Sequence, residues 1–250
     1  MKARHQFAAL LLLVPVSAAL AGAVPMTANI IQVSATSSDG ATASFEEVFP
    51  VSSFNDSLSW TLPAPLTLRD NLGTAMGTIE DLKVTFNADP QVDLSFSIIN
   101  NDLTNAVMYS VSTATISFAA INNPQAAASA SMTLTQGAGS AAGGYTTGLL
   151  DGKAYQARYS SHPVIDTNTV FASLVPGLSF IGLGTSGTES SPVVGLTTIL
   201  GPVTMMESQF AFVLSPGDQA SGTSAFLVTP EPATLSVLLI GGLFLARRRR

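Results

Sequence analysis

Apolar and polar residues alternate along several stretches of this sequence, and that two-residue period is the strongest constraint on its fold. The clearest case runs from Val92 to Ile98. Because successive side chains of a strand point to opposite faces, this segment predicts a strand with one buried and one solvent-facing side. The same alternation recurs at Met132, Leu134, Phe210, Phe212 and Leu214. No interior stretch keeps the 3.6-residue period of an amphipathic helix.

Further short segments read as strands separated by turn-forming residues. The predicted strands cover residues 28–35, 43–49, 58–62, 79–86, 107–118, 155–160 and 225–228. Turn residues stand at 39–40, 87–90, 122–124, 151–152 and 215–218. Short strands with frequent turns predict an all-β fold, an antiparallel β-sandwich, and leave jelly-roll and immunoglobulin-like arrangements open.

Three local expectations follow from the turns. Asp151-Gly152 is predicted to form a tight hairpin turn between residues 146–150 and 153–160. Residues 209–214 and 225–228 are predicted to pair across the turn at 215–218. Small residues at 137–144 predict a mid-domain loop or boundary.

Charge is scarce and acidic in the interior of the chain. Residues 24–229 hold four basic side chains and fifteen carboxylates, a formal charge of −11, and no cluster of Lys or Arg. Nucleic-acid binding is excluded on this ground, because it requires a basic surface. Cysteine is absent, so disulfides, thiolate zinc sites and cysteine nucleophiles are excluded as well.

The N-terminus has the three parts of a secretory signal peptide. Lys2 and Arg4 precede an apolar run at residues 8–20, and Ala21 and Ala23 supply small residues before Val24. We expect export and cleavage by signal peptidase after residue 23, so that residues 24–229 form the exported domain.

The C-terminus combines a short apolar segment with a basic end. Pro230-Glu231-Pro232 precedes the uncharged residues 233–246, and the chain closes on Arg247, Arg248, Arg249 and Arg250. A helix over 233–246 would cover about 21 Å at about 1.5 Å per residue, against a hydrocarbon core of roughly 30 Å. The positive-inside rule would keep the arginines in the cytoplasm. The segment therefore predicts transient membrane anchoring.

These three parts, in this order, resemble the PEP-CTERM sorting signal, and the resemblance is confined to residues 230–250. It implies that the chain is a substrate of exosortase, a membrane-embedded cysteine protease-like enzyme. It also implies removal of the tail near Pro-Glu-Pro, followed by release or attachment at the surface, often in bacteria that make extracellular polysaccharide.

Patterns that could carry chemistry are weak. Gly182-Leu183-Gly184-Thr185-Ser186-Gly187 fits G-x-G-x-x-G, but loop and strand residues follow it where a dinucleotide site needs a helix. A flexible β connection explains it better. His162, the one histidine beyond the signal peptide, lies in a predicted loop with Ser160, Ser161 and Asp166 nearby. Residues so close in sequence rarely form a catalytic triad, so no catalytic residue and no cofactor is assigned.

Oxygen-bearing and aromatic side chains leave three alternatives open. Carboxylates at Glu46, Glu47, Glu80, Asp81 and Glu207 could serve a hydrolase. A structural Ca²⁺ could bind near Asn100, Asn101, Asp102 and Asn105, or near Asp166 and Asn168. A sugar-binding shelf could use Trp60, Tyr145, Tyr155 or Tyr159. For Trp60, core packing is the favoured interpretation, because Leu58 and Leu62 share its face.

The expected function is therefore non-enzymatic. We expect an exported cell-surface or extracellular-matrix protein with a structural or adhesive role, whose partners are the export machinery, an exosortase-type protease and extracellular polysaccharide. A carbohydrate-binding module is the first alternative, and a secreted carboxylate-dependent hydrolase is the second.

Overall fold

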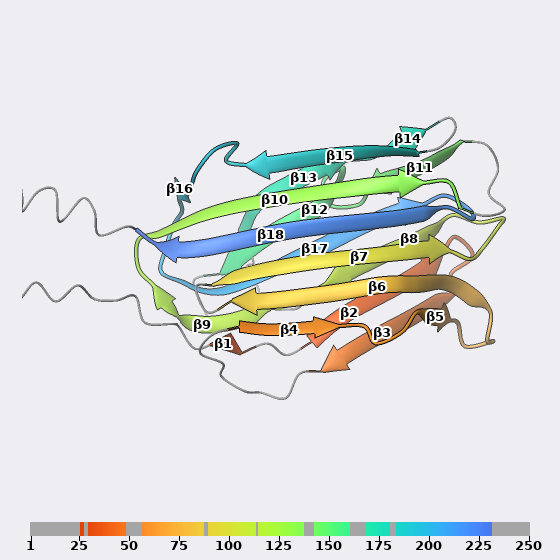
Figure 1. The fold of residues 1–250 in the computed structure, drawn as a ribbon, viewed down its shortest axis with the longest axis horizontal. Helices are drawn as coiled ribbons and strands as arrows, with labels where there is room; N and C mark the ends of the chain where they lie inside the picture. Colours follow the sequence, from red (N-terminus) through yellow and green to blue (C-terminus); the bar gives the residue numbers. More distant parts are fainter. Residues whose placement is uncertain are drawn as a thin grey trace, which may run out of the picture.

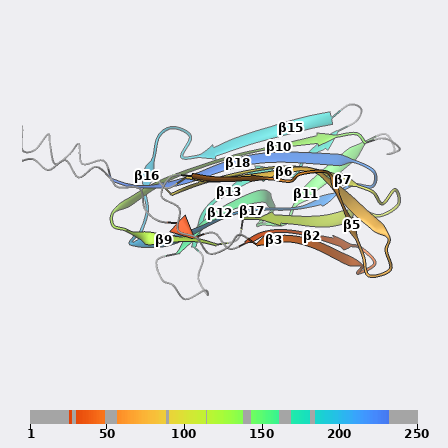
Figure 2. The same ribbon diagram turned by 60° about the horizontal axis from the view of Figure 1, so that its bottom comes forward.

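Two antiparallel sheets packed face to face make up the protein in a computed structural model (Figures 1 and 2). The structure describes residues 26–27, 30–48, 57–87, 90–113, 115–137, 143–160, 169–180 and 184–231. This arrangement confirms the predicted all-β antiparallel sandwich. The predicted signal peptide and the predicted helix at 233–246 lie outside the described residues. Within the described ranges, no helix has the length and apolar character to cross a membrane.

Sheet A is built around the long strand β17 (Val203–Leu214). One side of β17 pairs with β9 (Ile116–Ile121) and β8 (Val107–Ser112), and the other pairs with β12 (Lys153–Ser160) and β11 (Gly144–Gly148). The sheet is completed by β1 (Met26–Thr27), β2 (Ile30–Ser37), β3 (Thr42–Val48), β13 (Thr169–Pro176) and β14 (Ser179–Phe180).

Sheet B is built around β18 (Gln219–Pro230), the last strand of the described residues. It pairs with β7 (Gln91–Asn100) on one side and with β10 (Pro124–Thr135) on the other. Outer strands extend both sides: β6 (Ala75–Asn87), β4 (Ser57–Thr61), β5 (Leu66–Arg69), β15 (Gly184–Ser191) and β16 (Thr197–Thr198). Figure 1 shows β18 running through the middle of this layer.

The local expectations are met only in part. The tight Asp151-Gly152 turn is confirmed, since both residues have positive φ and the backbones of Leu150 and Lys153 exchange two hydrogen bonds across it. Beyond this bridge, β11 and β12 pair with β17 and not with each other. The turn at 215–218 carries the chain from sheet A to sheet B, so β17 and β18 do not pair. The predicted strand at 107–118 is two strands, β8 and β9, which lie in sequence along the same side of β17.

An aromatic cluster fills the centre of the sandwich. The Phe96 ring of β7 lies 5.0 Å from Phe210 and 5.6 Å from Phe212, both on β17. Gly222 of β18 stands opposite Phe96 in the register, and a Cβ there would lie 2.5 Å from the Phe96 ring. The glycine therefore makes the space that the ring occupies.

Hydrogen bonds join the two sheets through this apolar interior. The buried Tyr109 hydroxyl of β8 donates to the Met76 carbonyl of β6 over 2.9 Å. Ser208 Oγ of β17 lies 2.9 Å from the Tyr155 hydroxyl and 3.1 Å from Ser224 Oγ of β18. Buried polar groups satisfied in this way fix the position of one sheet against the other, because an unpaired group there costs about 1–3 kcal/mol.

The substitution Gly222→Ala is expected to destabilise the domain by about 1–3 kcal/mol, because its methyl group would force the Phe96 ring out of place. The free energy of unfolding from denaturant titration measures this effect. Ser221→Ala, on the outer face of the same strand, is the control and should change stability by less than about 0.5 kcal/mol. Equal effects of the two substitutions would contradict the packing described for Gly222.

Candidate functional site

The outer face of sheet B carries an array of hydroxyl side chains, which we call the hydroxyl face. Every second residue of its strands points outward, and on the central strands these positions hold mainly Ser and Thr. Its members are Thr85, Ser95, Ser97, Ser129, Ser131, Thr133, Ser186, Thr188, Ser190, Ser221 and Thr223. Neighbouring strands lie about 4.8 Å apart, so the hydroxyls form rows across the sheet.

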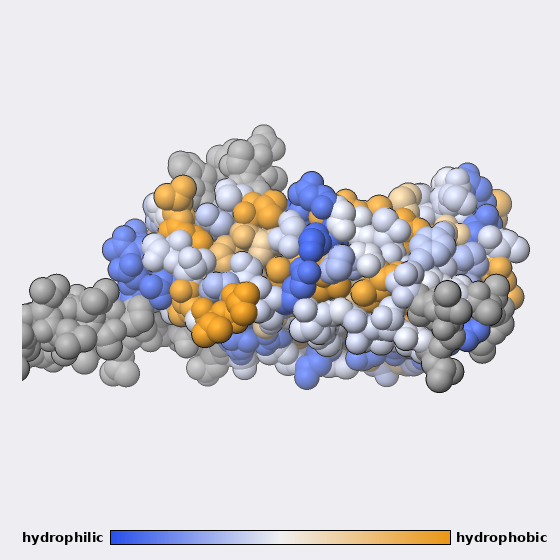
Figure 3. All heavy atoms as spheres, turned by 90° about the horizontal axis from the view of Figure 1, so that it is seen from above, coloured by the Kyte–Doolittle hydropathy of each residue, from blue (hydrophilic) through white to orange (hydrophobic). Residues whose placement is uncertain are grey.

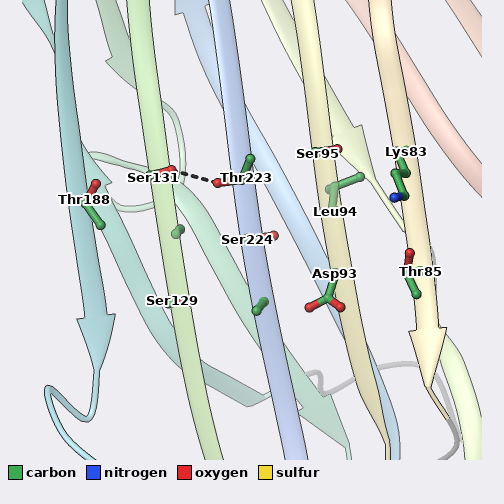
Figure 4. Close-up of a pocket in the computed structure, with 12 residues that line it drawn as sticks. Lys83, Thr85, Asp93, Leu94, Ser95, Ser129, Ser131, Thr188, Thr223 and Ser224 are labelled. Atoms are coloured by element: carbon green, nitrogen blue, oxygen red, sulfur yellow. Dashed lines mark hydrogen bonds between the residues drawn. The ribbon is translucent and has the colours of Figure 1, made fainter. Parts of the chain in front are cut away.

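The best-defined row runs through the middle of the face. Register places Thr188, Ser131, Thr223, Ser95 and Lys83 side by side on five adjacent strands. Ser131 Oγ and Thr223 Oγ1 share a hydrogen bond of 2.8 Å. Together with residues of the next row, this row lines a shallow depression of about 510 Å³ (Figure 4).

Charged groups lie at one side of the depression. Lys83 of β6 lies opposite Ser95, and Asp93 of β7 lies opposite Thr85. The Gln91 amide donates to both carboxylate oxygens of Asp93, over 2.8 and 2.9 Å. The depression thus offers a cation, a carboxylate and hydroxyls that both donate and accept. This chemistry suits an extended, polyhydroxylated or otherwise polar chain lying across the strands.

The proposed aromatic shelf is divided between the interior and the surface. Trp60 of β4 is partly buried and stacks on Phe45 of β3, with ring centroids 6.2 Å apart, so it closes one side of the sandwich. Tyr155 and Tyr159 are buried, and burial raises the pKa of Tyr155 to about 12. Tyr145 of β11 is exposed. These four side chains do not come together in an exposed row.

Three of the five candidate carboxylates, Glu46, Asp81 and Glu207, lie on the outer faces of the two sheets. Glu46 accepts a hydrogen bond from Gln32, and Glu207 accepts one from Ser112, both on sheet A. Asp81 lies on the outer face of sheet B, where it pairs with Ser97 of β7. Asp93 lies four residues from Ser97 along the same strand, so the two carboxylates are separated by about 13 Å along the strand direction, at about 3.3 Å per residue. Hydrolytic carboxylate pairs lie about 5–9.5 Å apart.

A carboxylate outside the candidate set, Glu189, joins the edge strand of sheet B to sheet A. Glu189 of the edge strand β15 accepts a hydrogen bond from Lys153 Nζ over 3.1 Å and from the Val175 amide over 2.9 Å. Burial alone would raise the pKa of Glu189, but these hydrogen bonds and the Lys153 charge lower it. Val175 is a buried β-branched residue whose backbone has a φ of 63°, a strained conformation for this residue type. The hydrogen bond from its amide to Glu189 holds the backbone in this conformation.

The G-x-G-x-x-G residues lie partly on this edge strand. Residues 184–187 belong to β15, which pairs with β10 along its length, so the expected flexible connection is wrong for this part. Strand structure rather than a helix follows the glycines. His162, Ser161, Asp166 and Asn168 lie outside the described residues.

The residues expected near a calcium ion instead hold a loop against the sandwich. Asn100 donates to the carbonyls of Asn105, Leu214 and Ser215, so it connects the end of β7 to the end of β17. Asn101 donates to Thr78 Oγ1 over 2.8 Å. Among the described residues, no group of three His, Cys, Asp or Glu side chains is placed to hold a metal ion.

Asp102 organises the same loop. Burial alone would raise its pKa, but hydrogen bonds from the hydroxyl and amide groups of Thr104 and from the side-chain and backbone amides of Asn105 lower it to about 2. The loop lines a second depression, of about 670 Å³, with residues near Asp39 and Asp70. Each of those two carboxylates accepts hydrogen bonds from the backbone of its own turn.

The sorting residues are described only at their start. Pro230 is the last residue of β18, and the Glu231 amide donates to the Asn123 carbonyl over 3.1 Å. Pro232 and the four arginines, like Ala21 and Ala23 at the other end of the chain, lie outside the described residues.

No protein-family model and no curated protein matches the chain. Among solved structures, a similar one is the enzymatically active domain of bacteriophage CBA120 tailspike protein 4, at 8% identity and a TM-score of 0.26. The match covers 68% of this chain and 19% of that chain, so this chain spans about a fifth of its length. At this TM-score the likeness carries no inference about fold or activity.

At low pH, Asp102 is expected to contribute less to the stability of the folded protein. Because the pKa of Asp102 is lower in the folded protein than in the unfolded chain, its contribution to stability is complete above about pH 4 and is lost as the pH falls through about 2. Asp102→Asn keeps the shape and one acceptor oxygen but cannot titrate. The difference in unfolding free energy between the native protein and this variant should therefore shrink from pH 5 to pH 2. A constant difference would contradict the assignment.

Proposed function

We propose that this chain is an exported cell-surface or extracellular-matrix protein with a structural or adhesive role, delivered through an exosortase-type sorting system. The observation that carries the proposal is the position of the Pro-Glu-Pro motif. The last strand of the sandwich ends at Pro230, and Glu231 is exposed just beyond it. A protease acting at the motif would therefore find its substrate at the end of the folded domain, without an intervening linker.

Cleavage at this motif would leave the described fold intact. The strand order of sheet B depends on residues 219–230, and the Glu231 amide just beyond them donates to the Asn123 carbonyl. Loss of residues 233–250 therefore removes no strand from the described domain. The described domain thus reaches Pro230, the first residue of the proposed signal, which supports a sorting role for residues 230–250.

Mature protein isolated from cells that carry an exosortase is expected to lack Arg247 to Arg250. Intact mass measurement reports this directly. The control replaces the motif, through Pro230→Ala, Glu231→Ala and Pro232→Ala together, and should keep the arginines. The proposal fails if the native sequence keeps its full C-terminus on every molecule.

The hydroxyl face favours a second function, binding of extracellular polysaccharide. Its rows of Ser and Thr repeat at about 4.8 Å across strands and about 6.6 Å along them, and both spacings lie on the scale of a sugar ring. Such a surface would bind through many hydrogen bonds rather than through aromatic stacking. An adhesive role and polysaccharide binding would then use the same face.

Replacing the central hydroxyl pair tests this second function. Ser131→Ala with Thr223→Val is expected to weaken retention on immobilised extracellular polysaccharide about tenfold, since each neutral hydrogen bond contributes about 0.5–1.5 kcal/mol. Ser34→Ala with Ser44→Ala, a pair in register on the outer face of sheet A, is the matched control. Equal retention of the native protein and both variants would count against binding at the hydroxyl face.

A further inference from the structure

An uncharged loop with exposed apolar side chains connects β15 to β17. We call residues 192–202 the apolar loop; it includes β16 and contains no Asp, Glu, Lys or Arg. Val193, Val194 and Leu200 are 84%, 87% and 85% exposed. Single exposed apolar residues are ordinary on a protein surface, whereas several gathered on one loop mark a contact surface. Figure 3 shows hydrophobic residues at several places along this face, with hydrophilic residues among them.

The apolar loop lies where the chain leaves the sandwich. Thr197 and Thr198 pair with Ala126 and Gln125 of β10, and the same end of β10 pairs with the end of β18 at Pro230. The Ile199 amide donates to the Pro124 carbonyl over 3.0 Å, which fixes the loop beside this point. Figure 1 shows β16 and the arrowhead of β18 at the same end of the molecule.

Very little chain separates this end from the apolar tail. The uncharged residues 233–246 begin two positions after Glu231. Two residues span at most about 7 Å, since an extended chain covers about 3.3–3.6 Å per residue. Whatever surface the tail enters must therefore lie close to the apolar loop.

We propose that the apolar loop is a second membrane contact, which rests on the lipid bilayer while residues 233–246 are inserted. The inference rests on the proposed function, because it requires the tail to enter a membrane. Exposed Val and Leu side chains suit the boundary between headgroups and acyl chains, where apolar groups bury about 5–10 Å deep. The contact would hold the domain upright on the membrane and set the height of the Pro-Glu-Pro motif above it.

Charge supports the same orientation. The exported region is strongly acidic, and acidic surfaces are repelled by anionic headgroups. The apolar loop itself presents no charge to the bilayer, and the exposed Glu231 is a carboxylate at the same end of the molecule. At the opposite end lie the turns of Asp39, Asp70 and Asp102, whose loops line one depression together.

A single fluorescent label on the full chain tests the proposal. The native sequence lacks cysteine, so Val194→Cys can be labelled alone with an environment-sensitive dye. Leu72→Cys is the matched control, because Leu72 is 85% exposed and lies in the β5–β6 turn at the opposite end. In vesicles of phosphatidylethanolamine and phosphatidylglycerol, emission from position 194 should shift to shorter wavelength and be quenched by headgroup-attached quenchers. Emission from position 72 should do neither.

The outcomes separate this proposal from the one on which it rests. If the full chain floats with the vesicles but the label at 194 behaves like the label at 72, membrane anchoring stands and the apolar loop contact is wrong. If the chain does not float, the anchoring step fails and the contact fails with it. A shift without vesicles overturns the proposal as well. It would indicate a second copy if it depends on protein concentration, and the chain's own tail if it does not.

Discussion

The pairing of β18 with both β7 and β10 is the interaction on which the rest of the structure depends. Although β18 is the last strand in sequence, it lies at the centre of sheet B and pairs with nine residues of β7 and twelve of β10. In the described structure, β4 to β7 and the group of β10, β15 and β16 belong to one sheet through this strand. On the inner face of β18, Gly222 leaves the space that the Phe96 ring occupies. Ser224 of the same strand forms a hydrogen bond with Ser208 of β17.

This central position gives the boundary at Pro230 a physical meaning. Sheet B is complete only when residues 219–230 have been added, and β18 ends at Pro230. The domain would therefore finish folding with its last strand close to the membrane that we propose the tail enters. The hydroxyl face and the uncharged apolar loop would then both be presented by the same folded domain.

The sequence predicts correctly those strands in which large apolar side chains alternate with polar ones. Val92 to Ile98 and Phe210 to Leu214 both alternate as predicted, because Phe, Ile, Leu and Val mark the buried face clearly. The first half of β10 was missed because its inward positions are Ala126, Ala128 and Ala130, and alanine does not stand out from the Ser residues between. The strand at 184–191 was missed because glycines and polar residues fill it.

Pairing partners lie beyond what alternation can predict. The segments 209–214 and 225–228 carry a turn signal between them, yet the chain changes sheets there, and only long-range packing decides this. Similarly, Tyr155 differs little from a surface aromatic in sequence, but it lies in the interior, where its hydroxyl is 2.9 Å from Ser208 Oγ. The inward position of Trp60, which stacks on Phe45, had a signal, because Leu58 and Leu62 share its face. The hydroxyl face had a signal, since Ser and Thr occupy alternate positions of β10 and β7, but the register that aligns these residues across strands comes from the fold.

Hydrogen–deuterium exchange on the full chain tests the central role of β18 most directly. Its amides from Ala220 to Val228 should exchange as slowly as those of the β7 core, near the rate set by global unfolding, with protection ending within a few residues of Pro230. Fast exchange throughout β18, with β7 and β10 still protected, would contradict the account, because the two halves of sheet B would then hold together without their central strand.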